Sequence, residues 1–357
     1  MKSQSFNIRE LIEELVLSPS ISGFETETRE KISSILTSMG MSVESDVMGN
    51  LYGIKRGGEK YKLMLAAHMD QIGLMVTNVD EKGFVYFSSR SFDPRVIYGQ
   101  KVTLYTEKGK INGVIGAKAV HLTKPEEREK AVKIEDMYID IGANSKEDVL
   151  NLGIRPGTVG TTTPYLSELA NGKVSGVGLD DKAGVVAILY ATYIALSNGI
   201  NGELYTVATV QEEVGLRGAI TSSYNVKPDI AIAVDVTHAV SPGVDPNLIS
   251  GVDLGKGPVI GIGPNFHPKM WTMLEEISKE FNIPYQLEAL PNLSGTDAAA
   301  IQVSRGGVIT GLISIPLRYM HSPVEAVSLN DIENASKLIA KFIEKLNNLD
   351  WKRTFSF

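Results

Sequence analysis

The sequence predicts an α/β protein in which a mainly parallel sheet is flanked by helices and a small β-barrel domain is inserted. Apolar strand-like runs alternate with helical patterns at both ends of the chain, and this alternation favours a parallel sheet covered on both faces. Between these ends, short β-rich runs separated by glycine turns are typical of a small barrel or sandwich. We therefore expect a discontinuous α/β domain, residues 1–70 and 165–357, and an inserted domain, residues 71–164.

Length, charge and cysteine content limit the class of protein. The chain has 357 residues, enough for about two domains, and its 43% hydrophobic and 22% charged residues are those of an ordinary globular protein. The net charge of −7 argues against nucleic acid or an anionic membrane as the main partner. Cysteine is absent, so any metal ion must be held by His, Asp and Glu.

The first residues show no targeting segment. The stretch 1–9 is polar and lacks the apolar core of a signal peptide. No apolar run reaches the roughly 20 residues that a membrane-spanning helix needs. We expect a cytoplasmic protein without a membrane partner.

The amino-terminal part is predicted to hold two helices followed by two strands. Apolar residues at helical spacing indicate helices over residues 7–16 and 26–39. Thr26 is expected to cap the second helix. Strands are expected at residues 51–55 and 62–69, and the second of these is strongly apolar.

The inserted region is predicted to be almost entirely β. One short helix is expected at residues 146–152, and the charged residues 124–133 are expected to form an exposed segment. The expected strands are residues 73–78, 84–88, 101–105, 110–115 and 137–141.

After residue 172 the alternation of strands and helices returns. A strongly apolar helix is expected at residues 182–197. The closing helix at residues 329–346 is expected to begin with Ser328 and Asp331 as a capping pair. The other expected elements are strands at 204–211, 230–236 and 308–315 and a helix at 269–281.

Two adjacent carboxylates, Glu212 and Glu213, follow an apolar, β-branched run. An unpaired carboxylate is costly to bury, so both are expected where the strand ends in a loop. There both side chains can turn toward one cation, whereas in a regular strand they would point to opposite faces. On this stretch alone, a solvated acidic strand end explains the pair equally well.

His68 and Asp70 lie at the end of the apolar strand that precedes the insertion. The spacing places both side chains on one side of an extended backbone, so Asp70 can accept a hydrogen bond from the imidazole and orient His68 toward a metal. A lone His-x-Asp is more often a core histidine satisfied by a nearby acid. The pair therefore gains weight only from the other motifs.

Acidic residues also stand at the ends of two other apolar elements. Asp180 and Asp181 open the apolar helix, where capping needs only one acid and the other is left to bridge a pair of cations. Asp235 ends a buried strand, and ligands of open α/β sheets gather at such strand ends. His238 is expected to lie behind the site or at the surface.

His321 is the candidate ligand in the polar segment 316–325, which follows the last strand. Arg318 in this segment is either an ion-pair partner or a contact to an anion. Thr296 or Asp297 is expected to cap a helix or to contact substrate. No site role is expected for the two remaining histidines, His121 and His267.

Together these positions can build two metal sites that share one aspartate. Imidazole and carboxylate ligands without sulfur suit Zn²⁺, Co²⁺ or Mn²⁺, and two neighbouring ions can clamp a substrate carbonyl and activate a shared water. Glu212 is left over as general base for that water and as proton donor to a leaving amine. The first site would use His68, Asp180 and Asp235, and the second would use Asp180, Glu213 and His321.

Taken in order, these motifs resemble the M42 family of dinuclear metallo-aminopeptidases, which includes the tetrahedral TET peptidases. The resemblance covers nearly the whole chain and extends to residues 113–122 and 136–143 of the inserted region. The motifs that carry it are Ala67-His68-Met69-Asp70, Gly178-Leu179-Asp180-Asp181-Lys182, Gln211-Glu212-Glu213-Val214-Gly215, Val234-Asp235-Val236-Thr237, Ser294-Gly295-Thr296-Asp297-Ala298 and Arg318-Tyr319-Met320-His321-Ser322-Pro323.

The resemblance implies an aminopeptidase that removes N-terminal residues from peptides with two divalent ions, Zn or Co, in each subunit. It implies Glu212 as general base, Asp70 as the residue that orients His68, and the five ligands named above. It also implies dimerisation through the inserted domain and, commonly, twelve subunits around an interior cavity. Lys182 stands where many relatives carry Arg, and it is expected to keep a positive charge beside Asp181.

Three other functions are weighed against this one. Some relatives carry an endoglucanase label, but a glycoside hydrolase needs two carboxylates on opposite sides of a sugar, roughly 5 to 9.5 Å apart, and no metal. The adjacent Glu212 and Glu213 suit that poorly, and the histidines would have no role. A metal-binding assembly protein would not need Glu212 as a base. A metal-dependent deacylase on the same scaffold is the nearest chemical alternative, and substrate trials separate the two.

Overall fold

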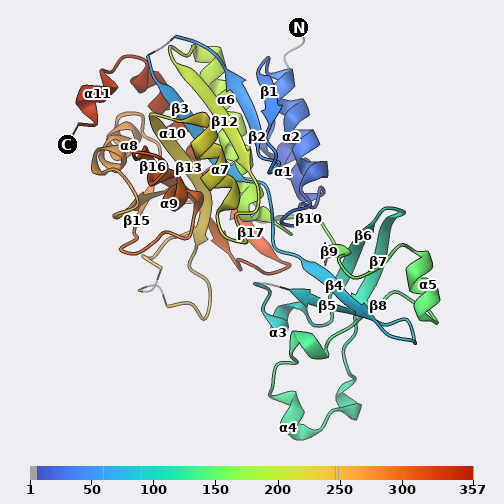
Figure 1. The fold of residues 1–357 in the computed structure, drawn as a ribbon. Helices are drawn as coiled ribbons and strands as arrows, with labels where there is room; N and C mark the ends of the chain where they lie inside the picture. The colour runs from blue at the N-terminus through green and yellow to red at the C-terminus, as the bar shows by residue number, and fades with distance from the viewer. Residues whose placement is uncertain (1–5, 59, 90, 246, 248, 357) are drawn as a thin grey trace.

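The computed structural model describes residues 6–58, 60–89, 91–245, 247 and 249–356, without the side chains at positions 127 and 128. The strands form two units, a large sheet with helices on both faces and a closed barrel beside it (Figure 1). This arrangement confirms the predicted fold class, an α/β sheet flanked by helices with an inserted small barrel.

The large sheet is mixed, with a parallel centre. Its strands in chain order are β1 (Ser42–Ser45), β2 (Leu51–Lys55), β3 (Lys62–His68), β10 (Leu166–Leu169), β11 (Lys173–Gly176), β12 (Glu203–Thr209), β13 (Ile230–His238), β14 (Val259–Ile262), β15 (Gln286–Ala289), β16 (Ile309–Arg318) and β17 (Glu325–Ser328). The order across the sheet is β1-β2-β12-β3-β13-β16-β17-β11-β10, with β14 and β15 as a side branch on β16. Strands β12, β3, β13 and β16 are parallel, as predicted, and the row continues antiparallel on either side.

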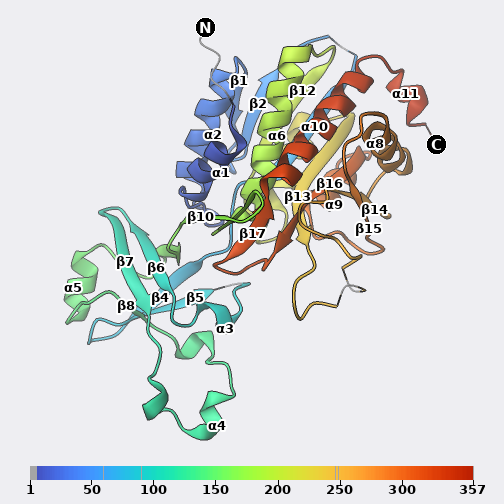
Figure 2. The same ribbon diagram turned by 180° about the vertical axis from the view of Figure 1, so that it is seen from behind.

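Helices cover both faces of this sheet. On one face lie α1 (Ile8–Val16), α2 (Thr26–Ser38), α6 (Leu179–Asn198) and α10 (Leu329–Leu346), which Figure 2 shows in front of the strands. On the other face lie α7 (Arg217–Val226) and α9 (Asp297–Gln302), in front in Figure 1. Helix α8 (Pro268–Glu280) packs against β14, β16 and α10, and α11 (Trp351–Thr354) closes the described chain.

Helix α6 is buried because it lies between the sheet and the helices α1 and α10. Apolar side chains surround it on all sides, and Val185, Val186 and Leu189 are fully buried. Helix α10 differs, since its apolar residues form one stripe toward the core, and its charged residues other than the buried Asp331 lie nearer the surface. The strongly apolar run that predicted α6 therefore marks a central helix, whose first residues are held inside the protein.

The inserted unit is a closed barrel with strands in the order β4-β5-β8-β7-β6-β9. Its strands are β4 (Leu74–Val79), β5 (Val85–Ser89), β6 (Lys101–Thr106), β7 (Gly109–Ile115), β8 (Ile139–Asp140) and β9 (Val159–Thr162). Short helices α3 (Pro94–Ile97), α4 (Pro125–Arg128) and α5 (Lys146–Asn151) lie between them. A separate apolar core fills the barrel. The chain enters the barrel within six residues of the end of β3, so the two units meet close to the carboxyl end of that strand.

Two predicted helix caps are wrong. Thr26 lies inside α2, and the N-cap position is Glu25, whose side chain makes no capping hydrogen bond. Ser328 occupies the N-cap of α10 without a side-chain bond, and Asp331 instead accepts hydrogen bonds from the backbone N–H groups of Gly255 and Gly257 at 2.6 and 2.8 Å. For Asp331, a contact distant in sequence takes the place of the local one. Seven strands of the structure were not predicted, namely β1, β9, β10, β11, β14, β15 and β17.

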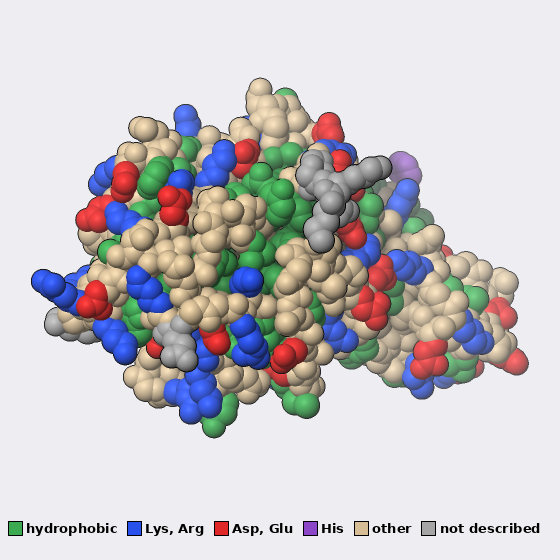
Figure 3. All heavy atoms as spheres, turned by 90° about the horizontal axis from the view of Figure 1, so that it is seen from above, with side chains coloured by type: hydrophobic (Ala, Val, Ile, Leu, Met, Phe, Trp, Pro, Cys, Tyr) green, Lys and Arg blue, Asp and Glu red, His purple; other side chains and the backbone are tan. Residues whose placement is uncertain are grey.

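Among the described residues, the structure has no helix both long and apolar enough to cross a bilayer. Figure 3 shows the molecule from above, with acidic and basic side chains interspersed over the face. Such mixed charge is ordinary for the surface of a globular protein. The candidate site lies elsewhere, at the carboxyl ends of the parallel strands.

Candidate metal centre

Five predicted ligands come together at the carboxyl ends of the central strands. His68 is the last residue of β3 and pairs in register with Thr209 at the end of β12. The glutamates follow β12, Asp235 lies near the end of β13, and His321 follows β16. Parallel strands end at one edge of a sheet, so residues from these four strand ends reach one place, and Asp180 joins them from the start of α6. The ligand set is His68, Asp180, Glu213, Asp235 and His321.

The first candidate group is His68, Asp180 and Asp235, all buried. The His68 Nε2 atom lies 3.1 Å from Asp180 Oδ1 and 3.8 Å from Asp235 Oδ1. One imidazole nitrogen and two carboxylate oxygens thus face a common point. This is the arrangement predicted for the first metal site.

The second candidate group is Asp180, Glu213 and His321. The His321 Nε2 atom lies 3.3 Å from Asp180 Oδ2 and 3.3 Å from Glu213 Oε2. Asp180 therefore presents Oδ1 to the first group and Oδ2 to the second. In each group the donor atoms lie within 4.8 Å of one another, which is compact enough for ligands of a single small cation.

The donor set fits a divalent transition metal. It consists of imidazole nitrogens and carboxylate oxygens, the ligands of zinc and its neighbours in sulfur-free sites. Within the described part of the chain, the buried atom Glu213 Oε1 has no hydrogen-bond partner. A buried carboxylate oxygen without a donor is costly, and a cation would satisfy it.

The crowded carboxylates shift the pKa values of the site. Burial raises the pKa of Glu212 to about 10 although the nearby His68 opposes it, and burial raises the pKa of Asp235 to about 8. Burial also disfavours the charged form of His321, but Asp180 and Glu213 raise its pKa to about 10. For Asp180, hydrogen bonds from His321 and His68 overcome burial and hold its pKa below the ordinary value. A bound cation would take over the role of these protons.

The start of α6 separates the roles of its two aspartates. Asp180 and Asp181 have non-helical backbone angles, and the Asp181 carboxylate turns back to accept a hydrogen bond from the Gly184 N–H at 3.0 Å. A Cβ on Gly184 would collide with that carboxylate. Asp181 is therefore the capping acid of the pair, which leaves Asp180 free to point into the site.

Lys182 does not lie where it was expected. Its side chain is fully buried, and its ammonium group donates to the backbone carbonyl of Ser18 at 3.0 Å and to the amide oxygen of Gln71. Burial lowers the pKa of Lys182 to about 7. The predicted position beside Asp181 is wrong, because the helix carries the lysine toward the amino-terminal segment.

Asp70 contacts the site differently from the prediction. The His68 Nδ1 atom lies 3.0 Å from the backbone carbonyl oxygen of Asp70 and 3.6 Å from its carboxylate, so the hydrogen bond that orients the imidazole goes to the carbonyl. The carboxylate instead accepts the backbone N–H groups of Glu212 at 2.9 Å and Glu213 at 3.3 Å. Asp70 is fully buried.

Glu212 lies beside both groups without belonging to either. Its Oε2 atom is 4.0 Å from His68 Nε2, and 10% of its side chain is exposed. Burial raises the pKa of this carboxyl in the metal-free protein, whereas cations bound nearby would favour its charged form, which can accept a proton. The structure thus places Glu212 next to the candidate ligand His68 and outside both donor groups.

One functional residue was missed and several alternatives are resolved. Glu325 is buried and accepts the backbone N–H groups of His321 at 2.9 Å and Asp180 at 3.3 Å. It is the last residue of the polar segment 316–325, and its place four residues after His321 was the available signal. Arg318 donates to the carbonyl of Val240 at 2.7 Å, and Asp297 accepts from the Thr209 hydroxyl without capping α9.

The other histidines stay outside the donor groups. His238 and His121 are exposed, and His267 occupies the N-cap of α8, where its ring accepts from the Lys269 N–H at 3.3 Å. These positions agree with the predictions for all three residues.

Comparisons with known proteins agree with this geometry. The sequence model of the M42 glutamyl aminopeptidase family matches residues 49–338. A lysyl aminopeptidase of Pyrococcus furiosus is 36% identical over 346 residues, covering 96% of this chain and 98% of that protein. Among solved structures, the TET1 peptidase of Pyrococcus horikoshii superposes with a TM-score of 0.84 at 34% identity, covering 94% of this chain and 99% of the other.

A further solved relative bears a different name. An endoglucanase of Thermotoga maritima superposes with a TM-score of 0.73 at 29% identity, covering 95% of this chain and 99% of the other. The family model, the relatives and the shared fold define the class as an aminopeptidase. The chain belongs to the M42 glutamyl aminopeptidase family.

Proposed function

We propose that this aminopeptidase is metal-dependent and removes N-terminal residues from peptides at a dinuclear site. The observation that supports this most directly is the pair of donor groups that share Asp180. In the proposal, His68, Asp180 and Asp235 hold one ion, and Asp180, Glu213 and His321 hold the other. Zinc or cobalt suits these ligands best.

The chain's own residues divide the remaining work. Bound divalent ions supply Lewis-acid polarisation of a carbonyl and an acidified water. Glu212 accepts a proton from the attacking water and returns it to the nitrogen of the leaving amine. Asp70 and Glu325 hold the backbone of the ligands Glu213 and His321, so that the donor atoms need little rearrangement.

The inserted domain, residues 71–164, is proposed to serve dimerisation, and the dimers to assemble into a dodecamer. A Pyrococcus horikoshii relative is described as a dodecamer and as able to form a tetrahedron or a larger octahedral shell. Twelve subunits with their sites facing an interior would admit peptides and exclude folded proteins. Light scattering of the purified protein would measure the assembly directly.

Two alternatives are kept as outcomes of the test. The endoglucanase name of one relative suggests glycoside hydrolysis as the first alternative. That reaction would leave His68 and His321 without a role. A deacylase on the same donor groups would differ only in the acyl group that it removes.

The experiment is hydrolysis of aminoacyl anilides by metal-stripped protein, with Co²⁺ or Zn²⁺ added back. N-acetylated anilides and carboxymethylcellulose run beside them. Metal-restored cleavage of the free-amino substrates alone is the expected result, and it also reports the preferred N-terminal residue. Cleavage of the acetylated substrates would favour a deacylase, and metal-independent cleavage of cellulose would overturn the proposal.

A further inference from the structure

The loop of residues 18–25, between α1 and α2, packs against the segment that follows His68. Ile21 forms an isolated parallel bridge with Gln71, and the Gln71 N–H donates to the Ser20 carbonyl at 2.9 Å. The Ser20 hydroxyl donates to the Met69 carbonyl. Backbone and side chain therefore fix the loop against Met69 to Gln71, on both sides of Asp70.

Within this loop, Ser22 contacts the Asp70 carboxylate. Its hydroxyl donates to Asp70 Oδ2 at 2.7 Å. The same carboxylate accepts the N–H of Glu212 on Oδ1 and the N–H of Glu213 on Oδ2. Three donors from two distant segments thus fill both oxygens of one buried carboxylate, and Ser22 is the only side chain among these three.

The acid of the loop, Glu25, lies close to the same segment. Glu25 is 5% exposed and accepts a hydrogen bond from the backbone N–H of Gly23 at 2.6 Å. The backbone N–H of Gln211 also favours the charged form of Glu25, although burial raises its pKa to about 7. Gln211 has a left-handed backbone with φ 55°, so the chain turns sharply just before Glu212. The loop therefore supports the turn of residues 211–213 at two points.

We infer that Ser22 is a positioning residue for the catalytic segment, because its hydroxyl fixes the Asp70 carboxylate that holds the backbone of Glu212 and Glu213. A carboxylate can rotate about its last bond, and a third donor selects the one orientation that receives both N–H groups. Without this hydroxyl, Asp70 Oδ2 keeps only the longer bond of 3.3 Å to Glu213. The two glutamates, one in the second donor group and one as the proposed base, then lose a fixed position. The catalytic part of this inference rests on the proposed function.

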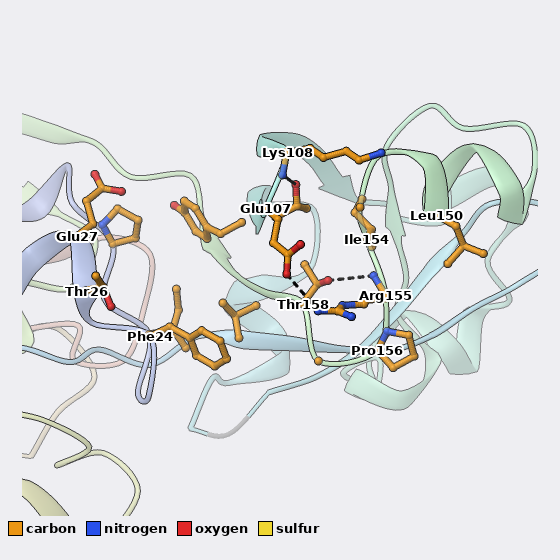
Figure 4. A pocket seen from close by; sticks show the side chains of 17 residues that line it. Phe24, Thr26, Glu27, Glu107, Lys108, Leu150, Ile154, Arg155, Pro156 and Thr158 are labelled. Carbon is orange, nitrogen blue, oxygen red and sulfur yellow. Dashed lines mark hydrogen bonds and ion pairs between the residues drawn. The ribbon is translucent and has the colours of Figure 1, made fainter. Parts of the chain in front are cut away.

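The other side of the loop faces away from the site. Pro19, Ile21 and Phe24 line a cavity of about 840 Å³ between the α/β unit and the barrel. Figure 4 shows Phe24 and Thr26 on one wall and Glu107, Arg155 and Thr158 of the barrel region on the other. The loop's support of Asp70 and its contact with this cavity are therefore made by different side chains.

The test compares Ser22→Ala with Ser22→Thr, which keeps the hydroxyl, and with Ser18→Ala, which removes a hydroxyl of the same loop that contacts Glu27 at 3.4 Å. The first readout is hydrogen exchange of the amides of residues 211–213 in metal-free protein. Ser22→Ala is expected to speed this exchange about 10-fold, and the other two variants are expected to match wild type. Unchanged exchange in Ser22→Ala would overturn the inference whatever the enzyme's substrate.

The second readout is kinetic, on the metal-loaded enzyme. We expect kcat of Ser22→Ala to fall about 10-fold with KM nearly unchanged, and Ser22→Thr to restore it. A Ser22→Ala change in an Asp70→Asn background is expected to cause no further loss, because both act through one carboxylate. If the losses of kcat in the two single variants add up in the double variant, Ser22 does not act through the Asp70 carboxylate. If wild type cleaves no free-amino substrate, the proposed function fails, and the exchange measurement still decides the positioning.

Discussion

The two donor groups use the same kinds of ligand but differ in exposure. In the first group His68 is 2% exposed and Asp235 9%. In the second group His321 is 32% exposed, while Glu213 is 8% exposed. Both groups share Asp180, so the difference comes from the histidines and from the backbone that carries them. An ion in the first group would be enclosed, and an ion in the second would stay accessible from solvent.

The cause lies in the elements that supply each group. His68 and Asp235 belong to the regular ends of β3 and β13, inside the sheet. His321 follows β16 in a loop where Tyr319 and His321 itself have positive φ angles of 62° and 58°. Strand ends give rigid, buried ligands, whereas a loop brings its ligand in from the rim. The comparison therefore predicts unequal exchange of the two ions.

Replacing the shared ligand should have the largest effect. Asp180→Asn keeps the side chain's size but removes the charge that faces both groups. We expect loss of both ions and activity below detection, measured by elemental analysis after dialysis. As a control, Asp331→Asn replaces another buried acid, one that bonds Gly255 and Gly257, and should lower the melting temperature without removing metal. Full metal content in Asp180→Asn would remove the bridging role.

Replacing the proposed general base should separate turnover from metal binding. Glu212→Gln is expected to lower kcat by about 10² to 10⁴-fold, the usual contribution of a general base, with metal content intact. The neighbouring change Glu213→Gln should instead reduce metal content, because Glu213 lies 3.3 Å from His321 Nε2. Activity retained in Glu212→Gln would refute the base assignment.

The expected difference in metal exchange between the two donor groups is tested by replacing one ligand from each group. His321→Ala should leave about one ion per subunit, held by the enclosed group. Asp235→Ala should lose the slowly exchanging ion and keep the fast one. Release of metal to a chelator, followed over time, distinguishes the two variants. Equal release kinetics in both would mean that exposure does not govern exchange here.

The smallest effect expected is a pH dependence of stability in the metal-free protein. The pKa values of Asp235 and Glu212 are raised to about 8 and about 10, and that of His321 to about 10. These groups hold protons in the folded state that the unfolded chain has released, so stability falls as pH rises between about 5 and 8. We expect the melting temperature to drop by several degrees across that range, and bound metal to flatten the slope. An identical slope with and without metal would contradict this account.

The positions of the candidate ligands were predictable because their signals are local. An apolar run that ends in His68 or Asp235 predicts a buried strand, and it also predicts that the residue lies at the carboxyl end of that strand. The fold class followed from the same alternation. Contacts between distant segments carried no such signal. Nothing near Asp70 in the sequence indicates that residues 211–213 fold over its carboxylate, and Asp331 looks like a local cap until the loop at Gly255 is placed against it.

Lys182 illustrates the same limit within a helix. Its position next to Asp181 suggested an ion pair, but consecutive helical residues point in directions about 100° apart. The direction of the side chain depends on where the helix lies, and α6 lies with Lys182 against Ser18 and Gln71. Glu325 shows a related limit. The polar segment 316–325 contains this residue, but only the folded chain shows that it accepts the backbone N–H of His321.

The chain passes from the α/β unit into the barrel directly after the strand that ends in His68, and Gln71 lies in this connection. Its amide accepts from Lys182, two residues beyond Asp180, and donates to Thr161 in the last barrel strand at 3.3 Å. The single side chain of Gln71 thus connects the barrel to Lys182. A displacement of the barrel would therefore strain residues close in sequence to the candidate ligands His68 and Asp180. If the barrels hold subunits together, the rigidity of each site depends on the whole assembly. An isolated subunit would then have a more flexible site and a lower turnover rate than a subunit within the assembly.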